Sequence, residues 1–318
     1  MPPGPSILLF KARGLTLIEL VVVLIILTAL TGVAVQSLEP LADQSRYEAT
    51  QQTLEDAGGA IFEQLSDGGS LTYTGFVADI GRLPVSVGTA PERYASELWD
   101  NDRDLNGVAD LPAFNLVPFD DPDTNEDESM RTNNRILVSA GWRGPYLLLP
   151  PGRDSLIDGF GNPIVCYDPT DTAIAAAGAQ ISLLRSLGSN NVQSIADTGY
   201  AVDLDSPQGL IEANDFQGTL VVQVRDNNGA DPTPAGDRIV VRVYGPVAGA
   251  AGELAEMEVN AANNFRIEFN GLLAGTRAVR VVDVSDTATN EDIEAESLVT
   301  YIVVQPGQVT EREIRIQP

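Results

Sequence analysis

The sequence predicts an α+β protein with a long N-terminal helix, a small head built on an antiparallel sheet, and an all-β C-terminal domain. Three observations predict this arrangement: an uncharged apolar run near the N-terminus, apolar residues at helical spacing after it, and Val-rich alternating segments towards the C-terminus. A chain of 318 residues is long enough for two domains after a leader. We expect a leader over 1–14, a helix over 15–65, a head over 66–214 and a β-domain over 215–318.

The N-terminal segment is first basic and then apolar. A leader that carries Lys11 and Arg13 ends in Gly14, and no residue over 20–38 is charged. Roughly nineteen residues at 1.5 Å each approach the hydrocarbon thickness of a bilayer, so we expect a membrane span within 15–38. A signal peptide or signal anchor is the alternative, but in an ordinary signal the small cleavage residues follow the apolar core, whereas Gly14 precedes it.

Glu19 is the only charge near the start of this apolar run. A carboxylate in a membrane helix costs roughly 2.5–3.5 kcal/mol and therefore needs a cationic partner. The residues KARG-LTLIEL resemble the prepilin cleavage and methylation motif, with Leu15 where that family usually has Phe. The resemblance implies that prepilin peptidase cuts after Gly14, that Leu15 becomes the N-methylated terminus, and that Glu19 neutralises the terminal ammonium of a neighbouring subunit. Opposite charges attract strongly in a low-dielectric bundle, which specifies register.

Beyond the apolar run, the pattern predicts an amphipathic continuation of the same helix with one face on a globular head. The apolar positions are Leu41, Tyr47, Leu54, Ile61 and Leu65. Pro40 is expected to kink this helix, because it removes a backbone donor, and Gly58 and Gly59 are expected to weaken its final turns.

The middle of the chain predicts short strands between Gly, Pro and Asn turns, with 163–167 as the best strand candidate. A Gly-Pro-Tyr-Leu segment over 144–147 and the following turn are similar to a stretch of the major pseudopilins of type II secretion. The residues of this turn are Asp158, Gly161, Asn162 and Pro163. We expect a structural role, in which Gly161 adopts a positive φ, Asn162 bonds nearby backbone and Pro163 fixes the entry into the next strand. An ordinary tight loop is the alternative.

Two loops are candidates for a Ca²⁺ site. The first has oxygen ligands at alternate positions around a Gly, as a loop wrapped around a hard cation requires. Its ligands are Asp100, Asp102, Asp104, Asn106 and Asp110, and the alternative is a solvated acidic turn. The second, over 181–200, resembles the Ser-Leu-Gly loop that holds calcium in pseudopilins, with Asn190 and Asp197 as candidate ligands.

The C-terminal part predicts an antiparallel sandwich. Seven short segments with turn signals between them, several of which alternate, lie over 219–226, 237–245, 255–261, 265–272, 277–284, 298–307 and 310–318. The pattern resembles Ig-like or transthyretin-like modules, which are more often spacers or binding modules than enzymes. An unidentified ligand of this domain is therefore expected, and 215–217 is the expected boundary.

Composition narrows the function. The formal net charge is −26, which argues against nucleic acid as a partner. The chain has no His, and its single cysteine, Cys166, excludes an intrachain disulfide. We found no nucleophile–base pair or phosphate loop, so we expect no enzyme.

We therefore expect a structural subunit of a type II secretion pseudopilus or type IV pilus-like filament. It would cross the bacterial inner membrane once with its head in the periplasm, and could become extracellular after assembly with other pilin or pseudopilin subunits. The alternative is a minor pilin whose C-terminal sandwich acts as a tip adhesin or recruits substrates.

Overall fold

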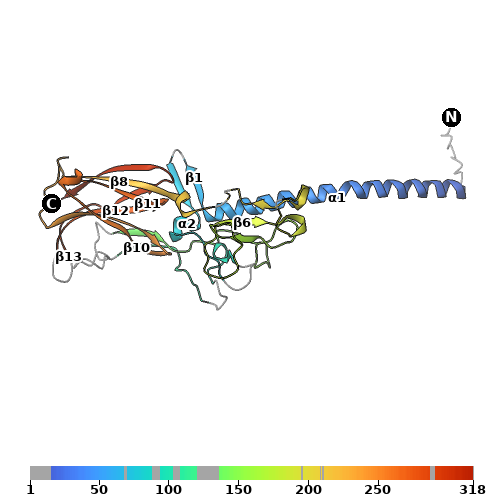
Figure 1. Ribbon diagram of the computed structural model, residues 1–318, viewed down its shortest axis with the longest axis horizontal. Coiled ribbons are helices and arrows are strands. Elements are labelled where there is room, and N and C mark those ends of the chain that lie inside the picture. Colours follow the sequence, from blue (N-terminus) through green and yellow to red (C-terminus); the bar gives the residue numbers. More distant parts are fainter. Residues whose placement is uncertain are drawn as a thin grey trace, which may run out of the picture.

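The structure is a computed structural model that describes residues 16–67, 70–87, 94–102, 108–119, 136–194, 196–207, 209, 211–286 and 291–317. Within these ranges it does not describe the side chains of 33–39, 66–67, 70–71, 117–118, 286, 291–292, 294 and 317. One long helix, α1, projects as a rod from a body of mostly β structure (Figure 1). The second half of α1 lies against the head, and the β-domain lies at the end of the molecule opposite the N-terminus. The architecture is α+β, as predicted.

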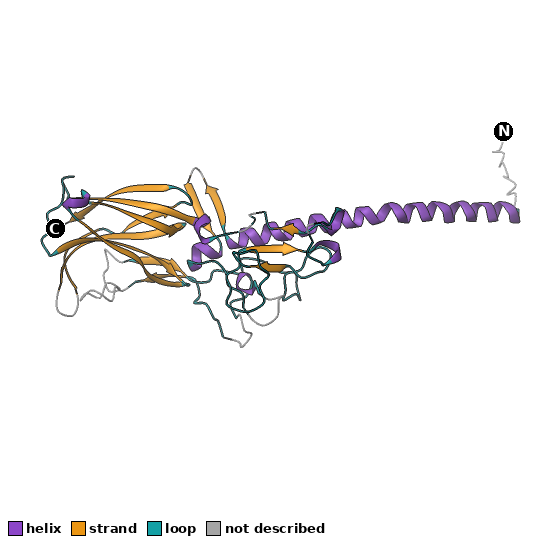
Figure 2. Ribbon diagram, viewed as in Figure 1, coloured by secondary structure: helices purple, strands orange, loops and turns teal. Residues whose placement is uncertain are grey.

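Helix α1 spans Leu17–Ile61, whereas the sequence predicted 15–65. Thr16 caps its start, and the Phe62 backbone N–H donates to the Gly58 carbonyl where the helix ends. Pro40, which was expected to kink the helix, lies inside α1, and α1 runs as one continuous element from Leu17 to Ile61 (Figure 2). We predicted a membrane-spanning segment within 15–38; over the residues that the structure describes, no helix has both the length and the apolar character needed to cross a bilayer.

The second half of α1 supplies one wall of the head core. Leu54, Ala57, Ala60 and Ile61 are buried and lie on one face of the helix, three or four residues apart. They pack with Phe76, Leu98, Cys166, Ile181, Leu184 and other residues of the head. The predicted stripe is too long at both ends: Leu41 is 62% exposed, and Leu65 lies in a strand after the helix.

The head contains short antiparallel strands, as predicted, connected mostly by turns and loops. The hairpins are β1 (Glu63–Asp67) with β2 (Ser70–Thr74) and β3 (Asn115–Pro118) with β4 (Leu137–Ala140). A three-stranded sheet is formed by β5 (Val165–Tyr167), β6 (Leu183–Ser186) and β7 (Leu204–Asp205). The helical pieces are α2 (Phe76–Ile80), η2 (Ser96–Leu98), η4 (Gly188–Asn190), η5 (Gly199–Ala201) and η6 (Ala213–Phe216).

The β-domain begins at Gln217 and contains eight hydrogen-bonded strands. They are β8 (Gln217–Arg225), β9 (Arg238–Val247), β10 (Ala250–Val259), β11 (Arg266–Leu273), β12 (Gly275–Asp286), β13 (Glu291–Ser297), β14 (Thr300–Val304) and β15 (Val309–Gln317), with η7 (Ala261–Asn263) between β10 and β11. Their order is β10-β9-β12-β13-β15-β8-β11, and β14 pairs with β12. Strand β13 was not predicted. The expectation of a fully antiparallel sandwich is wrong at one position, because β15 runs parallel to β8.

Several contacts join the head to the β-domain, and they include a backbone hydrogen bond and an apolar cluster. The Gly249 backbone N–H, in the turn between β9 and β10, donates to the Ile80 carbonyl of α2 at 2.8 Å. Strand β4 contributes Val138 and Ala140 to a small core with Tyr244 of β9 and Ala278 of β12. The outer face of the β9–β12 sheet is therefore partly covered by the head.

Candidate functional site

The first half of α1 presents an apolar surface that nothing in the described structure covers. Eleven large apolar side chains between residues 17 and 30 are each at least 44% exposed: Leu17, Ile18, Leu20, Val21, Val22, Val23, Leu24, Ile25, Ile26, Leu27 and Leu30. They occupy all sides of the helix and not one stripe. A helix that is apolar all round belongs in an apolar environment, such as a bundle of other helices or a membrane.

Glu19 lies at the start of this apolar helix and takes part in its N-terminal cap. Its Oε2 accepts hydrogen bonds from the Thr16 backbone N–H at 2.8 Å and from Thr16 Oγ1 at 2.9 Å. In return, the Glu19 backbone N–H donates to Thr16 Oγ1 at 3.4 Å, which completes a capping box. The acid therefore has a local structural role that the sequence analysis did not assign. The predicted processing residues, Gly14 and Leu15, lie outside the described residues.

The predicted turn after residue 157 is organised by the carboxylate of Asp158. Its Oδ1 accepts the backbone N–H groups of Phe160 at 2.9 Å and Asn162 at 2.8 Å, and its Oδ2 accepts Ser186 Oγ of β6 at 2.6 Å. Gly161 has φ +90°, a conformation that side chains disfavour. Pro163 pairs with Ile157 in an isolated bridge before β5 begins. Asp158 is buried, so the carboxylate holds the turn together away from water.

The same turn joins helix α1 to the loop after β6. The Gly159 backbone N–H donates to Thr50 Oγ1 at 2.9 Å, and a Cβ at Gly159 would lie 2.0 Å from the Arg46 carbonyl oxygen, so only glycine permits this approach. Asn162 bonds nearby backbone through its own carbonyl, which accepts the Asp158 backbone N–H at 2.8 Å. Its side-chain amide makes a distant contact instead, and donates to the Gly188 carbonyl of η4 at 2.9 Å. Because the Asp158 carboxylate already accepts the backbone N–H groups of the turn, the Asn162 side-chain amide is free to make this distant contact. The turn is therefore a junction between α1, β6 and η4.

The first candidate Ca²⁺ loop is closed by hydrogen bonds at its base. The backbone N–H of Asp102 donates to Asp100 Oδ1 at 3.0 Å, and Asn101 accepts the backbone N–H groups of Asp110 and Leu111, each at 2.9 Å. The other two candidate ligands, Asp104 and Asn106, lie outside the described residues. Among the described residues, no three acidic, Cys or His side chains are grouped so that they could hold a metal ion.

The second candidate Ca²⁺ site brings its two residues together. Asn190 Nδ2 donates to Asp197 Oδ2 at 2.6 Å, and Asn190 Oδ1 accepts the Val192 backbone N–H at 3.0 Å. Both the oxygen and the amide of Asn190 are thereby used in closing the loop. A cation held by this pair would have to replace the direct hydrogen bond between them.

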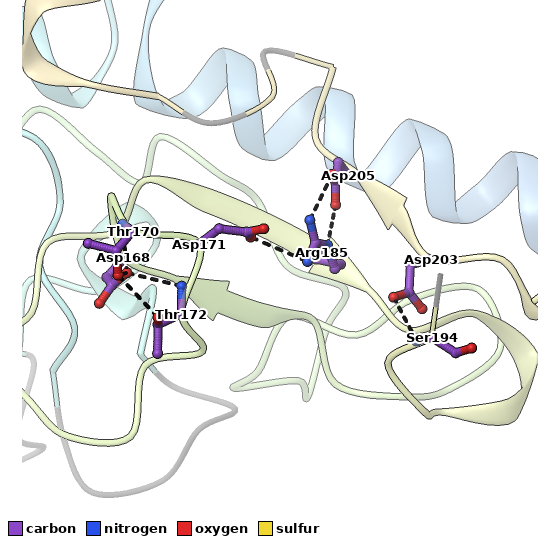
Figure 3. Close-up of polar contacts among 8 residues, drawn as sticks. All are labelled: Asp168, Thr170, Asp171, Thr172, Arg185, Ser194, Asp203 and Asp205. Carbon is purple, nitrogen blue, oxygen red and sulfur yellow. Dashed lines mark hydrogen bonds and ion pairs between the residues drawn. The ribbon is translucent and has the colours of Figure 1, made fainter. Parts of the chain in front are cut away.

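An arginine cluster, not predicted from the sequence, fastens the three-stranded sheet of the head (Figure 3). Arg185 of β6 forms ion pairs with Asp205 of β7 and, at 3.3 Å, with Asp171 of the loop after β5. Its guanidinium carbon lies 4.6 Å from the centre of the Tyr167 ring, and the neighbouring carboxylates raise its pKa. Two further acids accept backbone N–H groups: Asp168 accepts those of Thr170 and Thr172, and Asp203 accepts that of Ser194. These contacts stabilise the loops around the sheet, and the Thr170 hydroxyl also donates to Asp168 Oδ1 at 2.7 Å.

A cavity of about 530 Å³ lies where the end of α1 meets β2, α2 and residues 143–148. Asp79 is buried in its wall, where Oδ1 pairs with Arg143 Nη2 at 3.1 Å. Its Oδ2 has no hydrogen-bond partner in the part of the chain that the structure describes. Burial raises the pKa of Asp79, while Arg143 opposes that shift. The Arg143 backbone N–H donates to the Tyr146 hydroxyl at 3.0 Å, so the group is a polar network at the junction of helix and head.

No protein-family model and no curated protein matches the chain. Among solved structures, the minor pilin GBS52 of Streptococcus agalactiae is similar over 32% of this chain and 44% of that one, with 11% identity and a TM-score of 0.20. The Bacillus anthracis TIE protein is similar over 67% of this chain and 41% of that one, with 12% identity and a TM-score of 0.24. The chain thus spans less than half the length of either structure, and TM-scores this low do not establish a common fold.

Proposed function

We propose that the chain is a structural subunit of a type IV pilus-like filament, of the kind formed by type II secretion pseudopilins, and that it assembles through the first half of α1. The observation that carries the proposal is the projecting helix whose apolar side chains over 17–30 are exposed on all sides. Fully burying one large aliphatic side chain stabilises an assembly by about 1.5–3 kcal/mol, so eleven of them supply a large driving force for association. In the filament, this apolar surface of α1 is covered by the same helix of neighbouring subunits.

A bundle of such helices explains the position of Glu19. One carboxylate at the start of an otherwise uncharged segment is unfavourable in an apolar bundle unless a cation meets it. Cleavage after Gly14 would expose the amine of Leu15 next to Thr16, where the Glu19 carboxylate already accepts hydrogen bonds. We propose that the amine of a neighbouring subunit pairs with Glu19 during assembly. Before assembly the subunit is held in the bacterial inner membrane with its head in the periplasm.

The chain permits a direct test of the processing step, because Lys11 is its only lysine. Cleavage after Gly14 by prepilin peptidase removes Lys11 and leaves the Leu15 amine, with or without a methyl group, as the only reactive amine of the product. An amine-reactive dye, followed by peptide mapping, should therefore label Lys11 and Met1 in the uncleaved protein, and only residue 15 after cleavage. Replacing Gly14 by Leu should leave the Lys11 label in place. Cleavage at another position would contradict the proposal.

The assembly step is tested by Glu19→Val. The variant should still be cleaved, since the cut lies before the helix, but it should form few filaments. Glu19→Gln is the matched control, because its amide oxygen can still accept the Thr16 hydrogen bonds of the cap. Glu19→Gln has no charge and should also form few filaments. Wild-type filament levels from Glu19→Gln would refute the ion pair, and a loss confined to Glu19→Val would leave Glu19 as a helix cap only.

A minor subunit at the filament tip is the second candidate. The β-domain favours it, because this domain lies at the end of the molecule opposite the N-terminus and contains a cleft described below. The two roles differ in stoichiometry. Quantifying the protein in purified filaments separates them: one copy for each helical repeat supports the major subunit, and a few copies in each filament support the tip protein.

A further inference from the structure

The β-domain has an open seam between the two strands that end its hydrogen-bonded path, β10 and β11. A cleft of about 410 Å³ lies along this seam, within the range of small-molecule sites. Apolar side chains form most of its walls: Pro246, Leu254, Met257, Phe269, Leu272 and Leu273. The cleft thus lies between edge strands whose backbone groups are not used on their outer sides.

Both edge strands are irregular where they border the cleft. The register of β10 with β9 shifts between Glu253 and Ala255, and that of β11 with β8 shifts between Phe269 and Leu272. The residues inserted at these bulges, including Leu254 and Gly271, line the cleft. β-Bulges are enriched at sheet edges and beside binding sites, because they redirect side chains.

Arg277 of β12 brings a charge into this apolar cleft. It has the same strand parity as Val279 and Val281, which are buried in the core between the sheets, so its side chain is on the interior face. The residue is 1% exposed. Its Nη1 and Nη2 donate to the carbonyls of Thr276, Leu273 and Ala274 at 2.6–3.1 Å, and Nε has no hydrogen-bond partner among the described residues.

The charge on Arg277 is left without a counter-charge in the described structure. Burial alone lowers the pKa of its guanidinium to about 10, with no carboxylate opposing the shift, so the group remains protonated at neutral pH. Buried charges in proteins are usually paired, because an isolated one loses its hydration without compensation. Arg242 and Arg280, the other fully buried arginines of the described residues, each pair with a glutamate. Arg277 differs from them in lining a cavity instead.

From this combination we infer that the β10–β11 cleft binds a carboxylate with an apolar body, whose anionic group pairs with Arg277 and whose body lies against Leu254, Phe269 and Leu272. A carboxylate suits the site because guanidinium N–H groups, including Nε, donate to it with good geometry. A phosphate of similar charge would bring a larger hydrated anion into mostly apolar walls. The inference goes beyond the proposed filament role and does not depend on it.

The acidity of the protein does not prevent this binding. The only carboxylate among the lining residues is that of Glu268, which is exposed on β11. At physiological ionic strength the Debye length is about 8 Å, so solvent-exposed acids farther than that from the cleft are largely screened from it.

The test is an NMR titration of the full-length protein with 3-phenylpropionate, in a detergent that covers the exposed apolar part of α1. The ¹⁵Nε–Hε resonance of Arg277, identified by its loss in Arg277→Met, should shift and saturate with the acid. It should not shift with 3-phenylpropanol, the neutral analogue. Arg277→Met should weaken binding of the acid by about ten- to hundredfold, the loss of a hydrogen bond to a charged group. Equal affinity for the acid and the alcohol would overturn the inference.

Two further variants keep the test decisive if Arg277→Met fails to fold. Met257→Trp places a bulky side chain at the rim, at a residue 38% exposed, and should block the acid while leaving Arg277 in place. Arg266→Gln removes an exposed arginine of β11 that pairs with Glu311, and should leave binding unchanged. If Met257→Trp binds as the wild type does, the cleft is not the site. Tighter binding of a short apolar peptide acid than of 3-phenylpropionate would identify the carboxyl terminus of a polypeptide as the source of the carboxylate.

Discussion

Replacing Asp158 by Ala should destabilise the head strongly, because one buried carboxylate accepts three hydrogen bonds. The substitution leaves the backbone N–H groups of Phe160 and Asn162, and the hydroxyl of Ser186, without that acceptor. At roughly 1 kcal/mol or somewhat more for each, the expected loss is about 3–4 kcal/mol. This is a large fraction of the stability of an ordinary domain, about 5–15 kcal/mol. Asp158→Asn keeps an acceptor for both backbone groups and should lose about 1 kcal/mol.

The head contains a matched control for this substitution. Asp168 accepts the backbone N–H groups two and four residues later, those of Thr170 at 2.8 Å and Thr172 at 3.1 Å, just as Asp158 does, but at the surface. Urea unfolding followed by tryptophan fluorescence reports on the head, because both tryptophans, Trp99 and Trp142, pack against its core. The denaturation midpoint should fall most for Asp158→Ala, and Asp168→Ala should change it far less, because water can replace the lost acceptor. Equal midpoints for the two Ala variants would show that burial of the turn is not what makes it stabilising.

Three other predictions concern titratable and metal-binding groups. Burial raises the pKa of the Cys166 thiol to about 12, so this single cysteine should not react with a thiol reagent at pH 8 in the native protein. Its labelling rate should follow the unfolding of the head. Rapid labelling without urea would contradict this burial. The pKa of Asp79 is raised above its ordinary value of 3.8, so its contribution to stability is present below that pH and is lost as pH rises through the folded pKa. The free energy of unfolding of Asp79→Asn should not show this decrease with pH. A difference in unfolding free energy between wild type and Asp79→Asn that stays constant from pH 3.8 upward would refute the raised pKa. If Ca²⁺ binds the loop at Asp100 or the pair Asn190 and Asp197, chelator should lower the melting temperature, and an unchanged value would rule out a structural ion.

The β-domain shows which features of a fold a sequence pattern can predict. The segments that became β8, β9 and β11 were predicted because Val, Ile and Phe alternate with polar residues or run together. Strand β13, Glu291–Ser297, was missed because it is rich in acids and its pairing with β12 comes from tertiary context. The parallel pairing of β15 with β8 could not be predicted either, since strand direction depends on connections and not on periodicity.

The candidate sites show the same limit at the level of single residues. The glycine of the Asp158 turn was expected to need a positive φ because of its neighbours, and Gly161 has one. The partners Thr50 and Ser186 are far away in the sequence, so nothing local indicated them. Arg277 did carry a signal: in RAVRVVDV it has the parity of Val279 and Val281, which places a charge on the core face. Alternation indicated a charge among buried residues, but the even positions Ala278, Val282 and Val284 are equally apolar, so the sequence could not show which face of the strand lies between the sheets.

The contacts along α1 determine what assembly through its first half would do to the rest of the molecule. Leu54, Ala57 and Ile61 fix the second half of the helix in the head core, and the hydrogen bond from Gly159 to Thr50 adds a polar attachment. The contact from Gly249 to Ile80 then joins the head to the β-domain. Helices that associate over residues 17–30 would therefore carry the β-domain at the end farthest from the bundle (Figure 1). In a filament with its helices at the axis, the β10–β11 cleft would lie outside the bundle, where a free carboxylate ligand could reach Arg277.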